Sequence, residues 1–116
     1  MIDALRAAGF PGVEADGGVV HARLWSSSVE FTVVPENGAW RFALAWPVRA
    51  TEDQRAGWNL AHPDAPMDIH LGETRISMRI ADPGRDRLLR WATVAEEAVA
   101  ECIRWRRAQR APGEGM

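Results

Sequence analysis

Residues 28–46 read SVEFTVVPENGAWRFALAW, and this stretch decides the fold. Large apolar residues occupy every second position before and after the segment PENG, a period of two that is typical of β-strands. Asn37 and Gly38 tolerate the positive φ that closes a hairpin. A four-residue loop pairs Val34 with Ala39 and gathers the large side chains on one face. The stretch therefore predicts a hairpin with one apolar face.

A third strand is predicted at 19–25, directly before this hairpin. Alternation of apolar and polar residues supports it. A two-residue loop at Ser26-Ser27 pairs Ala22 with Phe31, although a slip by two residues keeps the apolar faces together equally well. Residues 13–15 fit either a short strand or an irregular lead-in.

A second hairpin is predicted at 67–80, where MDIHLGETRISMRI alternates in the same way. Gly72-Glu73 fits a type II′ turn, which pairs Ile69 with Ile76 and again gives one apolar face. Polar side chains gather on the other face of this hairpin. They include Asp68, His70, Arg75 and Arg79.

Three helices accompany the strands. The first is expected at 2–8, and the second follows the capping-box pattern of Thr51 and Gln54 as far as Leu60. The third begins at Asp82-Pro83 and continues to about Arg110 without a helix-breaking residue. One stripe of the third helix is apolar and is expected to face the core: Leu88, Ala92, Ala95, Val99 and Cys102.

The order α-βββ-α-ββ-α predicts an α+β domain. Its antiparallel sheet of about five strands has helices packed on one face, because each strand has a single apolar face to cover. We expect residues 1–110 to form one domain and residues 111–116 to be a disordered tail.

Composition narrows the function classes. Apolar residues make up 47% of the 116 residues, and the net charge is −2, so we expect a folded chain that does not favour nucleic acid. The N-terminus lacks the pattern of a signal peptide, and no apolar run is long enough to span a membrane. The expected location is the cytoplasm.

The element order resembles that of YbjN-like bacterial proteins and class I type III secretion chaperones. The most specific part is Trp58-Asn59-Leu60 at the end of a helix, followed by the hairpin at 67–80. This resemblance implies a small, non-enzymatic bacterial protein that binds other polypeptides and is often a homodimer. It brings no catalytic residues with it.

Chemistry-bearing side chains show no pattern typical of an active site. His62 and His70 bracket two aspartates in HPDAPMDIH, but their spacing matches no familiar metal-ligand pattern. His21 is expected on the polar face of a strand and Cys102 in the core. We therefore expect no metal, no cofactor and no enzymatic activity.

Tryptophans and small residues are the candidate partner contacts, because aromatic residues are enriched at interfaces. Trp91 and Trp105 lie beside the core stripe of the third helix, where they either cap this protein's own core or meet a partner. The remaining candidates are Trp25 and the off-core residues of the first hairpin: Val34, Ala43 and Ala45.

Two other functions stay open. A small-ligand site or a small enzyme would use the polar face around Asp68, His70, Arg75 and Arg79, provided that these side chains converge in a pocket. Nucleic-acid binding would use the arginine cluster at 104–110, and the negative net charge places it last.

Overall fold

A computed structural model describes residues 1–114, and it describes side chains as far as Gln109. Six antiparallel strands form one sheet in the order β1-β2-β3-β4-β6-β5, and three helices complete an α+β fold. In chain order the elements are α1 (Ile2–Ala7), β1 (Glu14–Asp16), β2 (Val19–Arg23), β3 (Glu30–Glu36), β4 (Ala39–Trp46), α2 (Glu52–Ala61), β5 (Met67–His70), β6 (Glu73–Ile80) and α3 (Arg85–Glu114).

The α+β class with helices on one side of an antiparallel sheet is as the sequence predicts, and the number of strands is one higher. The sixth strand is β1, whose three residues pair with β2 from Glu14↔His21 to Asp16↔Val19. From the sequence, residues 13–15 could be either a short strand or an irregular segment, because the stretch is too short to show a clear pattern.

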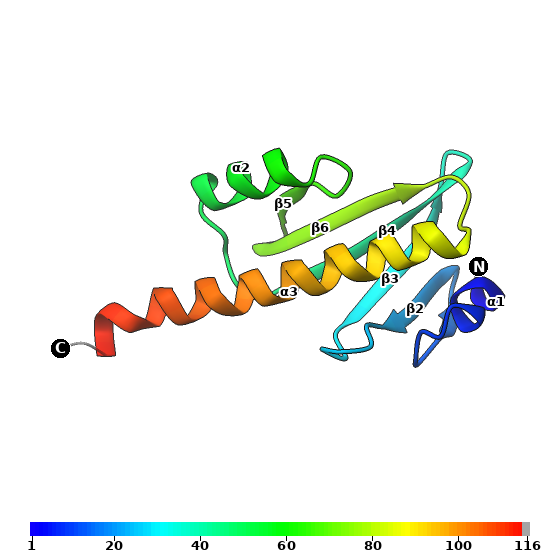
Figure 1. The fold of residues 1–116 in the computed structure, drawn as a ribbon, viewed down its shortest axis with the longest axis horizontal. Coiled ribbons are helices and arrows are strands. Elements are labelled where there is room, and N and C mark those ends of the chain that lie inside the picture. Colours follow the sequence, from blue (N-terminus) through cyan, green and yellow to red (C-terminus); the bar gives the residue numbers. More distant parts are fainter. Residues whose placement is uncertain (115–116) are drawn as a thin grey trace.

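The long helix α3 crosses one face of the sheet and continues past it (Figure 1). The molecule measures 51 × 26 × 25 Å, and α3 accounts for the long dimension. The predicted stripe from Leu88 to Cys102 is buried throughout, at 3% exposure or less. The core also holds Leu5 of α1 and Trp58 of α2, so all three helices contribute to the same side of the sheet.

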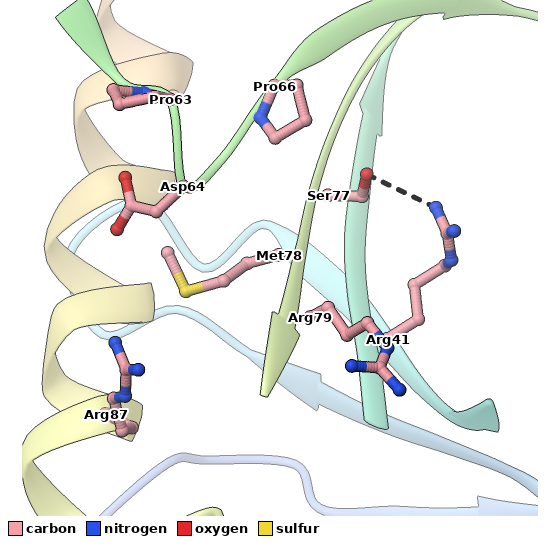
Figure 2. Close-up of a pocket in the computed structure, with 8 residues that line it drawn as sticks. All are labelled: Arg41, Pro63, Asp64, Pro66, Ser77, Met78, Arg79 and Arg87. Carbon is pink, nitrogen blue, oxygen red and sulfur yellow. Dashed lines mark hydrogen bonds between the residues drawn. The ribbon is translucent and has the colours of Figure 1, made fainter. Parts of the chain in front are cut away.

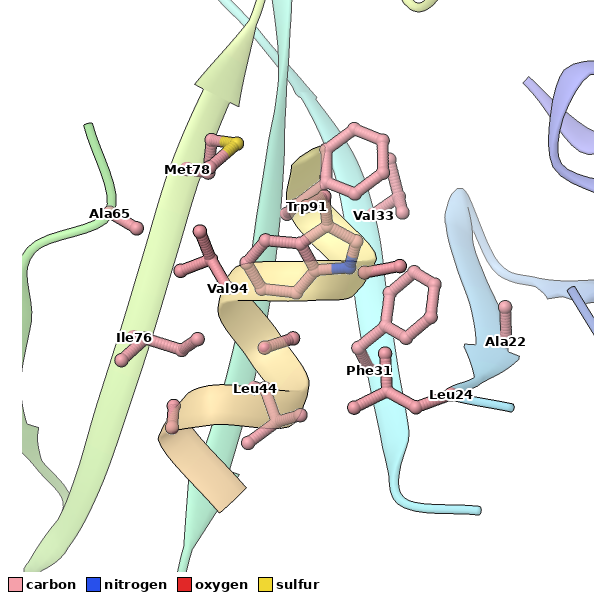
Figure 3. Close-up of a cluster of buried hydrophobic side chains, with 14 of the residues drawn as sticks. Ala22, Leu24, Phe31, Val33, Leu44, Ala65, Ile76, Met78, Trp91 and Val94 are labelled. Carbon is pink, nitrogen blue, oxygen red and sulfur yellow. The ribbon is translucent and has the colours of Figure 1, made fainter. Parts of the chain in front are cut away.

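Trp91 occupies the centre of this core (Figure 3). Its side chain is fully buried, and its ring meets those of Phe31 and Phe42 edge-to-face, with centroids 5.6 Å apart in both pairs. The burial rules out Trp91 as an exposed partner contact, which was one of the two alternatives from the sequence. The helix packs so closely on β3 and β4 that a residue beside the main stripe is enclosed as well.

The first hairpin is shifted by two residues from the predicted register. Glu36 pairs with Ala39 and Val33 with Phe42, so the turn is the two-residue Asn37-Gly38. Both turn residues have positive φ, +49° and +78°, as a type I′ turn requires. The four-residue loop was wrong because Pro35 belongs to the strand. A shift of two preserves the faces, so the predicted apolar face is retained.

The second hairpin is shifted in the same way. Met67 pairs with Ile76 and His70 with Glu73, and the turn is Leu71-Gly72 instead of Gly72-Glu73. Leu71 has a φ of +52° and is 89% exposed. A leucine disfavours positive φ, which is why the sequence pointed elsewhere. The third pairing, Ala22 with Phe31, is as predicted.

Both ends of α3 differ from the prediction. The first helical hydrogen bond runs from the Leu88 N–H to the Gly84 carbonyl, so Gly84 takes the N-cap position expected for Asp82. The helix continues to Glu114 and so includes four residues of the predicted tail. The last part of that tail, residues 115–116, lies outside the described residues.

Residues of α2 hold the start of β5 in place. The Asn59 amide group receives the Met67 N–H at 2.6 Å and donates to the Met67 carbonyl at 3.1 Å. The Trp58 indole N–H donates to the Ala65 carbonyl at 2.8 Å. The predicted capping box of Thr51 and Gln54 starts α2. These bonds turn the chain away from β6 just before Met67.

Replacing Leu71 by Asn is expected to raise the free energy of unfolding by about 1 kcal/mol, since Asn accepts the left-handed conformation that costs Leu this amount. Urea unfolding followed by fluorescence measures the change. Leu60, 87% exposed but helical, provides the control. Leu60→Asn should lower stability by about 0.5 kcal/mol. Equal effects of the two substitutions would contradict the turn geometry.

Replacing Trp91 by Ala is expected to cost about 3–5 kcal/mol, because it empties the centre of the core. The same urea titration measures the loss. Trp25→Ala serves as the comparison, since Trp25 is 43% exposed and stacks only at the sheet margin. A loss at position 91 no larger than at position 25 would show that Trp91 does not hold α3 to the sheet.

Candidate functional site

The face of the sheet away from α3 contributes no side chain to the main hydrophobic cluster of the described chain, and we call it the open face. Its central row consists of Thr32, Ala43 and Ser77, which lie side by side on β3, β4 and β6. Val34 and Ala43 are half-buried, and Ala45 is exposed. Around this row lie charges of both signs, in residues His21, Arg23, Glu30, Glu36, Arg41, Asp68, His70, Arg75 and Arg79.

A hollow of about 360 Å³ lies over Ala43 and Ala45, where the side chains are small. Glu30, His70 and Arg75 form part of its wall. Of the four residues proposed for a ligand site, the structure brings only His70 and Arg75 to this hollow.

The other two residues of that proposed set have different surroundings. Asp68 is engaged by Arg75 in a two-point ion pair at 3.0 and 2.7 Å, which holds the pKa of Asp68 below its usual range despite partial burial. Arg79 lies further along β6, where its guanidinium donates to the Asn37 carbonyl at 2.8 Å. The four side chains that the sequence suggested for a ligand site therefore do not all line one pocket.

The side chains of HPDAPMDIH turn to separate partners. His62 stacks on Trp58 and lies 2.8 Å from a Glu97 oxygen. Asp64 pairs with Arg90 at 3.1 and 3.2 Å, and this pair holds the pKa of Asp64 below its usual range. Across the described residues, no three His, Cys, Asp or Glu side chains gather as a metal site would require. His21 lies 3.4 Å from Glu30, without hydrogen-bond geometry.

The two remaining candidate tryptophans are partly accessible. Trp25 stacks on Phe10 with ring centroids 4.8 Å apart, and its indole N–H donates to the Gly9 carbonyl at 2.6 Å. Trp105 packs at the margin of the core and lines a hollow of about 260 Å³ between α2 and α3. Both therefore have a structural role and an accessible surface.

A third hollow, of about 370 Å³, lies beside the end of β6 (Figure 2). Met78 and Asp64 lie on the side of β6 that faces α3, which carries Arg87, while Ser77, Arg41 and Arg79 lie on the other side of β6 (Figure 2). Arg41 forms a two-point ion pair with Glu36 and donates to the Ser77 hydroxyl at 3.4 Å.

Sequence reasoning did not single out this hollow or its residues Arg41, Arg87, Pro63 and Pro66. A signal for it exists in the sequence, since Pro66 precedes a strand of four residues that faces a strand of eight. Pro66 has no N–H to donate to a strand ladder, so β5 begins only after it, at Met67.

A fourth hollow, of about 470 Å³, lies between α1 and the adjoining strands and has a mainly apolar wall that includes Met1, Ile2, Val20, Pro35 and Trp40. Near the opposite end of β2, the backbone N–H groups of Ser26 and Ser27 donate to the Glu96 carboxylate at 2.7 and 3.3 Å. Burial alone would raise the pKa of Glu96, but these bonds outweigh it and lower the pKa. Glu96 thereby ties the β2–β3 loop to α3.

Comparisons of this chain with protein-family models, with curated proteins and with solved structures found no match. Within residues 1–114, no helix combines the length and the apolar character needed to cross a membrane.

The Cys102 thiol is expected to resist modification in the native protein. Burial, and secondarily the nearby Glu101, raises its pKa to about 11, so about one thiol in a thousand is ionised at pH 8. A thiol-reactive chromophore should label the folded chain hardly at all and the guanidinium-unfolded chain fully. Complete labelling of the folded chain within minutes would contradict a buried, structural Cys102.

Proposed function

We propose that this protein is a non-enzymatic protein-interaction module, chaperone-like or regulatory, that acts as a homodimer through its open face. The observation that carries the proposal is a broad sheet surface whose middle consists of small side chains and which no described helix covers. Small residues such as Ala43 and Ser77 allow close approach of another surface. A large accessible face of low central charge is typical of an interaction site.

A second copy of the chain is the partner that fits this face best. In a two-fold dimer the same patch meets itself, so the patch has to be self-complementary. The open face meets this condition because acidic and basic groups occur at both of its ends. Glu30, Asp68 and Arg75 lie toward one end, and Glu36, Arg41 and Arg79 toward the other. The hollow over Ala43 and Ala45 also leaves room for side chains from a facing copy.

The resemblance to YbjN-like proteins and class I secretion chaperones supports the same proposal. These families consist of small proteins that bind polypeptides and often dimerise. The segment that carries the resemblance includes Asn59, which bonds both backbone groups of Met67. A bacterial, cytoplasmic protein is part of this proposal, and it is independent of the geometry of the open face.

Small-ligand binding is the second candidate, because the hollow of about 360 Å³ has the size of a small-ligand site. His70 and Arg75 would recognise an anionic group there. The proposal ranks below dimerisation because Arg75 is already engaged by Asp68 and the hollow is a shallow part of a broader surface.

The dimer is tested by light scattering at tens of micromolar. The native protein should show twice the 12.9 kDa mass of the chain. Ala43→Arg should yield a monomer, since it places a long charged side chain in the middle of the open face. Ala56→Arg is the matched control on the exposed side of α2 and should stay dimeric. A native protein that is strictly monomeric would overturn the proposed dimer.

A further inference from the structure

The last residues of β6 have a strand neighbour on one side only. On the inner side β4 pairs with β6 as far as Trp40↔Ile80, but on the outer side β5 pairs only from His70↔Glu73 to Met67↔Ile76. One more bond follows, from the Ser77 N–H to the Pro66 carbonyl at 3.2 Å. Pro66 lacks an N–H and cannot return the bond. The ladder therefore stops halfway along β6.

The unpaired backbone groups at this edge belong to Arg79. Backbone groups of successive strand residues point to opposite sides, so the Arg79 N–H and C=O point outward like those of Ser77. Within the part of the chain that the structure describes, neither group takes part in a backbone bond outward of β6. The hollow of about 370 Å³ lies at this edge, so another chain has room to approach.

The charges around this hollow favour an acidic partner, because its one acidic lining residue, Asp64, is already paired with Arg90, whereas Arg79 and Arg87 have no acidic partner among the described residues. Arg41 and Arg79 lie opposite each other on β4 and β6 and are found on one side of the edge, and Arg87 lies on the other (Figure 2). Arg87 forms no ion pair with any described residue. An added strand would present alternate side chains to the two sides. Acidic residues would meet Arg79, with Arg41 beside it already paired with Glu36, and apolar residues would meet Met78 and Pro63.

We infer that the free half-edge of β6 is a strand-addition site for an extended, acidic segment of a partner polypeptide. The segment would bond to the Arg79 N–H and C=O, as in other complexes in which a peptide extends a sheet. A second copy of this chain is a poorer occupant, because pairing β6 with itself would bring the arginines of both copies together. A single small anion also fits less well, because the arginines lie on both sides of the strand instead of converging.

This inference rests on the proposed protein-binding role but does not depend on the dimer. A monomeric protein that still binds an acidic strand would keep the strand-addition site and overturn the dimer. A dimer that fails to bind the peptide would keep the proposed dimer and overturn the strand-addition site.

The test is a titration of the full chain with the peptide acetyl-Val-Glu-Val-Glu-Val-amide, followed by NMR. Saturable binding with the largest amide shift at Arg79 is expected. A peptide with Lys in place of Glu should bind at least tenfold more weakly, and so should one N-methylated at the amides that face Arg79. Arg79→Glu should cause a loss of similar size, whereas Arg107→Glu, the same charge change on an exposed part of α3, should not.

Two outcomes would overturn the inference. The first is no binding of the acidic peptide at millimolar concentration. The second is equal binding of the N-methylated peptide, because attraction to the arginines alone would then account for the complex. In that case the arginines would serve to protect the edge from aggregation, which is a common role of charged residues on edge strands.

Discussion

The indole of Trp91 lies against the rings of Phe31 and Phe42, and this contact forms the centre of the core to which all three helices contribute. It fixes α3 across β3 and β4, the two strands of the hairpin with the most pronounced apolar face. Because all three helices then contribute to the same core, the other face of the sheet receives none of them. The open face is thus a direct consequence of where the helices find their apolar contacts.

The edges of the sheet are determined by smaller interactions. Asn59 satisfies the outward backbone groups of Met67, and Trp58 holds the Ala65 carbonyl, so the chain before β5 is bound to α2. Pro66 then ends the pairing with β6. The same few residues that close the outer edge of β5 leave the outward backbone groups of Arg79 without a strand partner. Protein contact on the open face and strand addition at this edge are both proposals that follow from the one-sided core.

The sequence predicted the faces of the strands and the pairing of Ala22 with Phe31, but not the registers of the two hairpins. Both hairpins are shifted by two residues, and a shift of two leaves every side chain on its predicted face. The first error came from treating Pro35 as part of the turn. The second could not be avoided from propensity, because Leu71 adopts a positive φ that leucine disfavours.

The sequence pattern also could not predict whether Trp91 and Trp105, which lie beside the main apolar stripe of α3, are buried. The stripe from Leu88 to Cys102 follows from helical periodicity, but whether Trp91 and Trp105 are covered depends on how closely α3 packs on the sheet. Among the site residues, Asp68 and Arg75 could be expected to interact because they share a face of one hairpin. The separation of Arg79 from Asp68 and Arg75 depends on where the pairing between β5 and β6 stops, and so does the hollow beside β6.

Residue-resolved amide hydrogen exchange in the native protein tests most directly whether β6 is paired with β4 along its inner edge and unpaired at Arg79 on its outer edge. The amides of Ile76 and Met78 point toward β4 and should exchange slowly, whereas the Arg79 amide, one residue further, should exchange orders of magnitude faster. This alternation requires both a firmly packed inner ladder and a free outer edge. Protection of Arg79 equal to that of Met78 would contradict it, because the outer half-edge would then already be paired.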